Sequence, residues 1–385
     1  MTDGDLRREM AEFNGRKYDE FWSELNAKLQ EKEKAGGVCG LTTALQALEM
    51  QQFDKGFIQD DLKSVVRYRL VDPSNRQHHF TIQYNPRRAL RQSGAGRTDP
   101  PPDAVKVNNG CFLCKENMRW QQRGIEAGYD LQAGERQYIA FMNPFPLMQT
   151  HTTIATAEHM PQSWIGPDTR SSGLRMQEIL HDLLSLTKRV PGFVGFYNGD
   201  GAGATIPQHF HFQFFRRVAG QEPFALERAA RRAIAEHDLQ GGEEETRNCS
   251  VVIRDFREYP IAAICFRGKQ EFIVECARQW VEQWTEFYRN SDALSANIIC
   301  TVDAEKSGLF HLYFVPRNKY VSHSVGMAGL VGGLEVFGEL VFSAEVEHEL
   351  LQSGRVDFGY VAHVINGVEA PGVQEFLNRI LPSRG

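Results

Sequence analysis

Residues 193–217 hold the side chains whose types and spacing are best suited to covalent chemistry. His209, His211 and Gln213 alternate with three phenylalanines. Period-2 alternation predicts a strand with one aromatic face and one face of two imidazoles and a carboxamide. A neutral imidazole beside a bound phosphate can act as a nucleophile and form a phosphoramidate. An amphipathic strand with two half-exposed histidines is the alternative interpretation.

A glycine-rich loop precedes these histidines. Asn198 begins a stretch of small residues that includes Gly203 and ends at Ala204, and Thr205 follows it. Bare backbone lets an anion approach closely and lets main-chain amides bind it. The β-forming residues 193–197 predict a short buried strand that leads into this loop. The combined pattern favours a phosphate-binding site in which His211 is the nucleophile.

The stretch NGDGAGATIPQHFHFQ resembles the active-site segment of the histidine-triad superfamily. It is most similar to the branch in which Gln replaces the third His: galactose-1-phosphate uridylyltransferase, diadenosine tetraphosphate phosphorylase and GDP-L-galactose phosphorylase. The resemblance implies that His211 carries a nucleotidyl group and that Gln213 binds its phosphoryl oxygens. Thr205 lies one residue further from His209 than that pattern expects. The loop residues implied to surround the phosphates are Asn198, Gly203, Ala204 and Thr205.

The resemblance also implies an activity. We expect a nucleotidyltransferase or phosphorylase that acts on a nucleoside diphosphate sugar, releases hexose-1-phosphate and transfers the nucleotidyl group to phosphate or a sugar phosphate. Two displacements imply ping-pong kinetics. A dinucleoside polyphosphate phosphorylase or adenylyltransferase differs only in the leaving group and stays open, as does a non-catalytic nucleotide-binding module. A hydrolase is disfavoured because Gln replaces the third His. The base, the sugar and a homodimeric state also stay open.

Cys111 and Cys114 form a C-x-x-C pair with the spacing of half a zinc site. A redox dithiol is the rival interpretation, but the thioredoxin-like pattern that it needs is missing. By resemblance to the uridylyltransferases, His159 and His209 complete the ligand set and the zinc is structural. His151 is the rival third ligand. Two core cysteines and two unrelated histidines are the alternative.

Two turns carry further residues that the resemblance places near the nucleotide. Asn143 lies before a turn within 136–160, which predicts two strands, and it matches the position that meets the ribose hydroxyls. An Asn that only forms the turn is the alternative. Asn85 and Arg87 end the hairpin predicted over 65–88, where an arginine can reach phosphates. A solvated basic strand end is the alternative there.

Composition limits the partners and the compartment. The 385 residues carry a net charge of -6, which argues against a nucleic-acid-binding surface. No apolar run approaches the roughly 18 to 20 residues of a membrane span, and the polar N-terminus has no apolar signal core. An odd number of cysteines, seven, indicates reduced thiols. We therefore expect a cytoplasmic protein without nucleic-acid or membrane partners.

Element order predicts a duplicated fold. In the second half, two strands, a helix and two strands are expected at 249–254, 261–266, 270–289, 297–301 and 309–316. This order repeats that of residues 136–217. The expected fold class is α+β, with two histidine-triad-like half-domains built on antiparallel sheets with helices on one side. The expected segments are a helical extension (1–62), a hairpin and linker (63–104), the catalytic half (105–245) and a degenerate half (246–385).

The second half keeps only part of the chemistry. His311 is the one histidine in HLYFVPR, and Arg317 and Lys319 follow it. Glu335 lies in GLEVFGELV, which resembles a stretch near the end of the GDP-L-galactose phosphorylases. A strand-end His, a solvated basic strand end and a solvent-facing Glu are the simpler interpretations of these positions.

Overall fold

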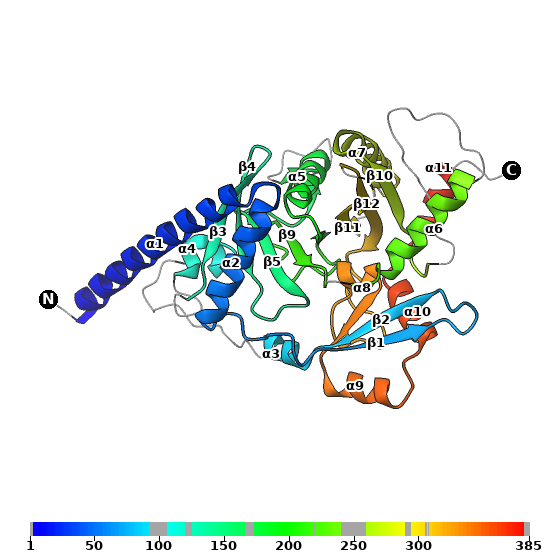
Figure 1. The fold of residues 1–385 in the computed structure, drawn as a ribbon, viewed down its shortest axis with the longest axis horizontal. Helices are drawn as coiled ribbons and strands as arrows, with labels where there is room; N and C mark the ends of the chain where they lie inside the picture. The colour runs from blue at the N-terminus through cyan, green and yellow to red at the C-terminus, as the bar shows by residue number, and fades with distance from the viewer. Residues whose placement is uncertain are drawn as a thin grey trace.

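The computed structural model describes residues 3–92, 106–119, 125–165, 173–218, 220–239, 259–288, 294–304, 306 and 308–380. Helices α1 (Asp3–Ala35) and α2 (Gly40–Asp54) form the predicted N-terminal extension. Figure 1 shows that the N-terminal end of α1 projects beyond the rest of the molecule. The rest of α1 packs against the body through a buried stripe at helical spacing, which consists of Tyr18, Trp22, Leu25 and Leu29.

An eight-stranded antiparallel sheet lies at the centre of the described structure, in the order β10-β12-β11-β8-β9-β5-β4-β3. Antiparallel strands suit this chain because short connections join consecutive strands, as between β3 and β4. The strands are β3 (Gly128–Ala133), β4 (Arg136–Met142), β5 (Gln149–Thr156), β8 (Phe193–Asn198), β9 (His211–Arg216), β10 (Ile264–Gly268), β11 (Leu294–Val302) and β12 (Phe310–Asn318).

The sheet has the same strand order on both sides of the β8–β11 boundary. The order β8-β9-β5 on one side matches β11-β12-β10 on the other. Helix α5 (Met176–Arg189) precedes β8 and helix α7 (Gln270–Phe287) precedes β11. The α+β fold class with two antiparallel halves and a helical extension is therefore confirmed, although both halves share one continuous sheet. The strand expected at 249–254 lies outside the described residues, and the segment boundaries stay predictions.

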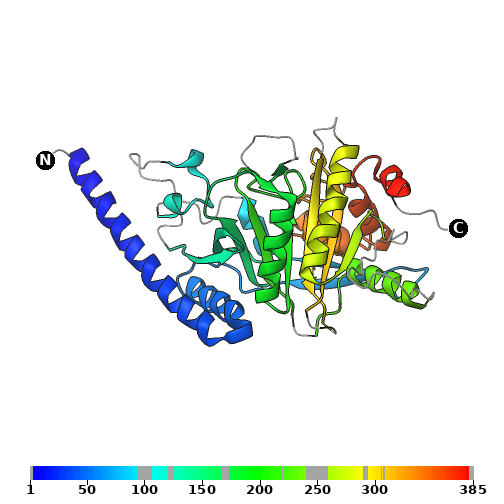
Figure 2. The ribbon, with the colours of Figure 1, turned by 90° about the horizontal axis from the view of Figure 1, so that it is seen from above.

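Helices α5 and α7 cover one face of this sheet, and Figure 2 shows them side by side. The phenylalanines of the β9 segment point toward them: Phe210, Phe212 and Phe214 are fully buried in the same core as the apolar side of α5. Burying one such side chain stabilises the fold by roughly 1.5–3 kcal/mol. The predicted aromatic face is thus the face that attaches the strand to the helices.

A second, three-stranded sheet covers the opposite face. The predicted hairpin forms β1 (Val66–Val71) and β2 (His79–Tyr84), and β2 also pairs in parallel with β13 (Glu339–Phe342). Short helix α8 (Gly333–Phe337) precedes β13, where the sequence predicted only a glycine-rich run before a strand. Helices α6 (Ala225–Leu239) and α10 (Phe358–Asn366) pack in this layer. Residues from the two ends of the chain therefore form one layer over the central sheet.

The remaining elements are short. They are η1 (Gly37–Cys39), η2 (Pro86–Arg88), α3 (Ala89–Gln92), η3 (Asn108–Gly110), α4 (Lys115–Met118), β6 (Trp164–Ile165), β7 (Leu174–Arg175), α9 (Glu345–Gln352) and α11 (Val373–Ile380). Within the described ranges, no helix combines the length and the apolar character that crossing a membrane requires.

Candidate active site

His211 is the first residue of β9, on the face opposite the helices. Its Nδ1 lies 2.8 Å from the main-chain carbonyl oxygen of His209. A carbonyl oxygen only accepts, so Nδ1 carries the proton and a neutral ring has its lone pair on Nε2. The ring is only 2% exposed. The β8–β9 register pairs Phe196 with Gln213, and its continuation places Asn198 beside His211.

Gln162 fixes the backbone of His211. Its Oε1 accepts from the His211 amide at 2.6 Å, and its Nε2 donates to the His211 carbonyl oxygen at 2.8 Å. The same Nε2 donates to the carbonyl oxygen of Asn198 at 2.9 Å. Gln162 is fully buried, so these bonds are shielded from water. One side-chain amide thus ties the start of β9 to the end of β8, and sequence reasoning did not single it out.

The glycine loop after β8 packs tightly against the second half of the chain. Gly203 has φ +96, and a Cβ added there would come within 2.4 Å of the Cα of Gly332. Only glycine adopts this conformation at little cost and allows this approach. The Oδ1 of Asn198 accepts from the amide of Gly333 at 2.9 Å. The loop is therefore shaped by residues more than a hundred positions later in the chain.

A cavity of about 360 Å³ lies between this loop and the second half. Among the predicted site residues, Asn198, Gly203, Thr205 and Gln213 line it, and so does Glu335. His211 lies two residues before Gln213 on the same face of β9, beyond the lining itself. Ala204 is in the loop but does not line the cavity. The volume falls in the range of small-ligand sites.

Three other predicted nucleotide residues lie elsewhere. Asn85 is fully buried and donates to the carbonyl oxygen of Pro146, and Arg87 is exposed and donates to that of Gln59. The neighbouring Arg88 lines the cavity instead. Asn143 lines a second cavity of about 280 Å³. The structure therefore brings Arg88, rather than Asn85, Arg87 or Asn143, to the cavity beside Gln213.

Asn143 and His151 take part in the turn between β4 and β5. The side chain of Asn143 accepts from the amide of Phe145 at 3.0 Å, which is the turn-forming bond that the sequence left as the alternative. Nδ1 of His151 accepts from the Leu147 amide at 3.1 Å. His151 is not part of the Cys–His cluster described next, so the geometry favours His159 as the third member.

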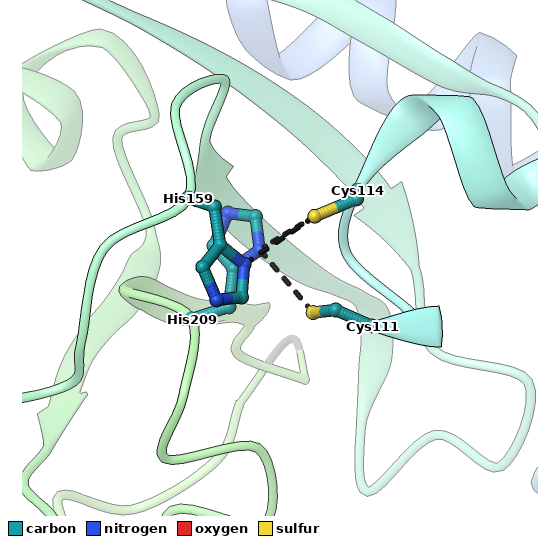
Figure 3. A group of neighbouring side chains, drawn as sticks. All are labelled: Cys111, Cys114, His159 and His209. Atoms are coloured by element: carbon teal, nitrogen blue, oxygen red, sulfur yellow. Dashed lines mark hydrogen bonds between the residues drawn. The ribbon is translucent and has the colours of Figure 1, made fainter. Parts of the chain in front are cut away.

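Cys111, Cys114, His159 and His209 converge in a mostly buried cluster, as Figure 3 shows. Their ligand atoms all lie within 4.8 Å of one another. Cys111 Sγ lies 3.4 Å from Nδ1 of His209, and Cys114 Sγ lies 3.4 Å from Nδ1 of His159. A tetrahedral zinc ion with usual bond lengths would separate S and N ligands by about 3.5 Å. The residues present therefore fit a zinc ion.

Neighbouring groups prepare two of these residues to bind a metal. Nε2 of His209 lies 2.8 Å from the carbonyl oxygen of Thr156, which directs its Nδ1 at the sulfurs. A hydrogen bond from Cys111, with further bonds from His209 and Asn108, lowers the pKa of Cys114 despite its burial. The bond to Cys114 and burial raise the pKa of Cys111. The pair therefore already favours one thiolate, the form that ligates metals.

The second half carries a related strand with different partners. The β8–β11 pairs run from Val194↔Thr301 to Asn198↔Asn297, with Phe196↔Ile299 in the middle. Phe196 pairs with Gln213 and Ile299 with Tyr313. A twofold rotation about the Phe196↔Ile299 pair therefore exchanges the two halves of the sheet and places Tyr313 at the position of Gln213. His311 lies two residues before Tyr313, as His211 lies two before Gln213, so it takes the position of His211.

His311 is engaged in a buried ion-pair cluster. Its Nε2 lies 3.2 Å from Oδ2 of Asp303, and Arg267 donates twice to the same oxygen at 2.9 and 3.0 Å. Burial lowers the pKa of His311, and Asp303 opposes that effect. Lys319, the other basic residue singled out in this half, lies over the ring of Tyr320. The second half thus uses its histidine in a structural contact.

Comparisons with known proteins complete this description. A family model described as a domain of unknown function (DUF4922) matches residues 46–216, which is less than half of the chain. No curated protein matches the chain by sequence. Among solved structures, yeast Ap4A phosphorylase Apa2 in complex with AMP is 15% identical, with a TM-score of 0.49 over 84% of this chain and 98% of that chain. Its complex with Ap4A gives the same values.

A uridylyltransferase structure is also similar. It is 11% identical, with a TM-score of 0.33, and the match covers 81% of this chain and 99% of that chain. The similar structures thus include an Ap4A phosphorylase and a uridylyltransferase.

Proposed function

We propose that this chain is a nucleotidyltransferase or phosphorylase in which His211 accepts a nucleotidyl group from a nucleoside diphosphate sugar. One observation carries the proposal. The bond from Nδ1 of His211 to the His209 carbonyl places the lone pair on Nε2, on the strand face where Gln213 lines the cavity. An imidazole in this tautomer, held at the edge of a ligand-sized cavity, is suited to attack phosphorus.

The reaction has two displacements. Nε2 of His211 attacks the α-phosphorus, a P–N bond forms, and the P–O bond to hexose-1-phosphate breaks with the electron pair leaving on oxygen. Phosphate or a sugar phosphate then attacks the same phosphorus and breaks the P–N bond. Gln213 and loop amides bind the phosphoryl oxygens as their charge changes. A phosphate leaving group departs as an anion, so the third position of the motif needs no acid, which agrees with an amide at 213.

Charge around the cavity supports an anionic ligand. Arg88 lines the cavity, and Arg317 lies close enough to act electrostatically on the cavity residue Glu335. Arginine is well suited to binding phosphate because its planar guanidinium donates two parallel hydrogen bonds. Arg88 is therefore the residue that we expect to contact the phosphates of the substrate or of the acceptor.

Transfer of label to the protein tests this proposal. The chain is incubated with GDP-hexose, UDP-hexose or Ap4A, each labelled at the α-phosphate, and the protein is separated under denaturing conditions. We expect an acid-labile adduct, one equivalent of released leaving group, and no label in His211→Ala. His181→Asn changes a half-exposed histidine outside the cavity and should keep the label.

Each outcome of this test has a defined meaning. Label from Ap4A alone would keep the covalent mechanism and assign a dinucleoside polyphosphate as substrate. Binding without an adduct would favour a nucleotide-binding module. Turnover that persists unchanged in His211→Ala would overturn the proposal.

We further propose that Cys111, Cys114, His159 and His209 hold one structural zinc ion. When bound, the ion would hold the segment before α4, the end of β5 and the start of β9 together. We expect about one zinc per chain. Cys114→Ser should lose the metal and lower the Tm by roughly 5–10 °C. Cys276→Ser, outside the cluster, should keep the metal and the unmodified Tm. Full metal content in Cys114→Ser would contradict this assignment.

We also propose a cytoplasmic location. The six cysteines in the described part of the chain are free thiols, which supports a reducing compartment. The partners implied by this function are the nucleotide sugar and a phosphate or sugar phosphate acceptor, with no role for nucleic acid or a membrane.

A further inference from the structure

Arg317 is a fully buried arginine that the second half contributes close to the first half's site. It lies near the end of β12 and is 0% exposed. Its Nε donates to the carbonyl oxygen of Val368 at 3.1 Å, and its Nη2 donates to that of Val331 at 2.8 Å. Its Nη1 donates to Oδ1 of Asn297. Sequence reasoning favoured a solvated strand end for this arginine over a contact with phosphate or substrate, whereas the structure places it in the interior.

Asn297 relays this contact to the loop of the first half. Its Nδ2 donates to Oδ1 of Asn198 at 2.8 Å and to the carbonyl oxygen of Ala202 at 2.7 Å. Asn198 lines the cavity and, by register, lies beside His211. A continuous chain of hydrogen bonds therefore runs from the guanidinium of Arg317 to the strand end and the glycine loop that surround the nucleophile.

The same arginine also holds the facing wall of the cavity. It donates to the carbonyl oxygen of Val331, and the next two residues in the chain, Gly332 and Gly333, line the cavity. Gly332 contacts Gly203, and Gly333 donates to Asn198. Arg317 thus sets both sides of the narrow gap between the glycine loop and the 331–333 segment.

The chemistry of the contacts shows why packing alone does not explain this residue. Its three acceptors are a side-chain amide and two carbonyl oxygens, so none of them carries a full negative charge. Burial lowers the pKa of Arg317 to about 9, and Glu335, at the cavity, favours its charged form. Burying a charge is unfavourable, and an apolar residue would fill the space at less cost. Retaining a guanidinium here is reasonable if its geometry, and an anion in the cavity, matter for function.

We propose that Arg317 is the positioning residue of the His211 site, acting through Asn297 to hold Asn198, the glycine loop and the 331–333 segment in the arrangement that binds the transferred phosphoryl group. This inference rests on the proposed function. It makes the second half a required part of the site: without its arginine, the first half keeps its nucleophile but loses the loop geometry around it.

Two variants test this role, with one matched control. Arg317→Lys keeps the charge but loses the planar fork that makes three bonds. Asn297→Asp keeps an acceptor for Arg317 but loses the donors to Asn198 and Ala202, so the fold should survive while the relay breaks. Arg267→Lys changes another second-half arginine, half-buried, which pairs with Asp303 and does not line the cavity.

The measurements are hydrogen–deuterium exchange of residues 199–204 and the rate of His211 labelling at saturating and limiting nucleotide, both well below each Tm. In Arg317→Lys and Asn297→Asp we expect exchange of the loop to rise at least tenfold and the maximal labelling rate to fall about 10- to 100-fold. Arg267→Lys should change neither by more than about twofold, even if its Tm falls.

The two hypotheses fail in different ways. If the loop amides exchange in both variants at the same rate as in the unmodified protein, the role of Arg317 is overturned, whether or not labelling occurs. Faster exchange with an unchanged labelling rate would also overturn it, because the loop would then be held without consequence for transfer. Absence of any label in the parental protein would overturn the proposed function, and the exchange result would then decide the positioning of the loop on its own.

Discussion

At the scale of single residues, the position of His211 depends on a side chain 49 residues earlier in the chain. Gln162 bonds to both the amide and the carbonyl of His211 and to the carbonyl of Asn198. It takes the place of a neighbouring strand, because His211 lies beyond the last residue pair of β8 and β9, Phe196↔Gln213. These bonds fix the backbone of His211, the proposed nucleophile, and its Nδ1 bond to the His209 carbonyl orients the ring.

Gln162→Met should therefore separate folding from transfer. It removes three buried hydrogen bonds and leaves polar groups unsatisfied, so we expect a loss of about 1–3 kcal/mol in the free energy of unfolding. We also expect His211 labelling to slow about 10- to 100-fold. The control is Gln52→Met, because Gln52 likewise bonds to a main-chain amide, that of Ala127 just before β3, and to the carbonyl of Ile125, and it does not line the cavity.

Gln52→Met should lower stability by a similar amount and leave labelling unchanged, as measured by denaturant unfolding and by the label assay. Equal effects of both variants on the labelling rate would show that Gln162 acts only through global stability.

The residue scale also shows what a sequence can reveal. The alternation of His209, His211 and Gln213 with phenylalanine was enough to predict the polar face of the strand, because period 2 is a local property. Gln162, Arg88 and Arg317 were not singled out in these roles, since each depends on a contact between distant segments. Gln162 carries one weak signal, its place three residues after the clustered His159.

At the scale of elements, the conformation of the glycine loop depends on positive φ angles and on its close approach to the second half of the chain. Gly203→Ala would introduce a Cβ at 2.4 Å from the Cα of Gly332, in a backbone conformation that side chains rarely adopt. Gly192 also has a positive φ, +83, but a Cβ there meets nothing within 4 Å. The two positions therefore separate backbone strain from collision.

We expect Gly192→Ala to lower the free energy of unfolding by about 1 kcal/mol, from backbone strain alone, and to keep labelling. Gly203→Ala should lose more stability and at least 90% of the labelling rate, because the loop must move away from the 331–333 segment. Denaturant unfolding measures the change in stability of each variant, and the label assay measures its labelling rate. A Gly203→Ala variant that labels at the parental rate would show that the loop conformation is not needed.

Local elements were largely predictable and their partners were not. The N-terminal helices, the 65–88 hairpin and the helix expected at 270–289, which is α7, followed from periodicity and turn signals. The parallel pairing of β2 with β13 joins residues such as Thr81 and Glu339, and no local pattern encodes it. The same holds for the β8–β11 boundary, which merges two expected sheets into one.

At the scale of the whole molecule, two related halves have divided their roles. The first half keeps His211 beside a cavity, and the second half supplies a wall of that cavity and the buried Arg317. Its own histidine, His311, lies 3.2 Å from Asp303 instead. Under the proposed function, the first half therefore carries the site and the second half shapes it.

His311→Asn should therefore leave His211 labelling within about twofold of the parental rate while lowering the Tm by a few degrees. Burial lowers the pKa of His311, so the folded state binds its proton less readily than the unfolded state does. Stability attributable to this group is present above about pH 6.5 and is lost as the pH falls below that value. Thermal unfolding between pH 5 and 7.5 should show a shallower decline in the variant. A large fall in labelling would instead give His311 a role in transfer.

The parallel pairing of β2 with β13 also bears on synthesis of the protein. The hairpin at 66–84 leaves the ribosome first, but the strand that completes its sheet, Glu339–Phe342, is made only after all the residues between them. A growing chain can form the helices and the His211 strand long before the layer on the opposite face of the central sheet is complete. The exposed apolar edge of that unfinished sheet would need shelter until then, so we expect nascent chains stalled before residue 339 to bind chaperones and full-length chains to be released from them.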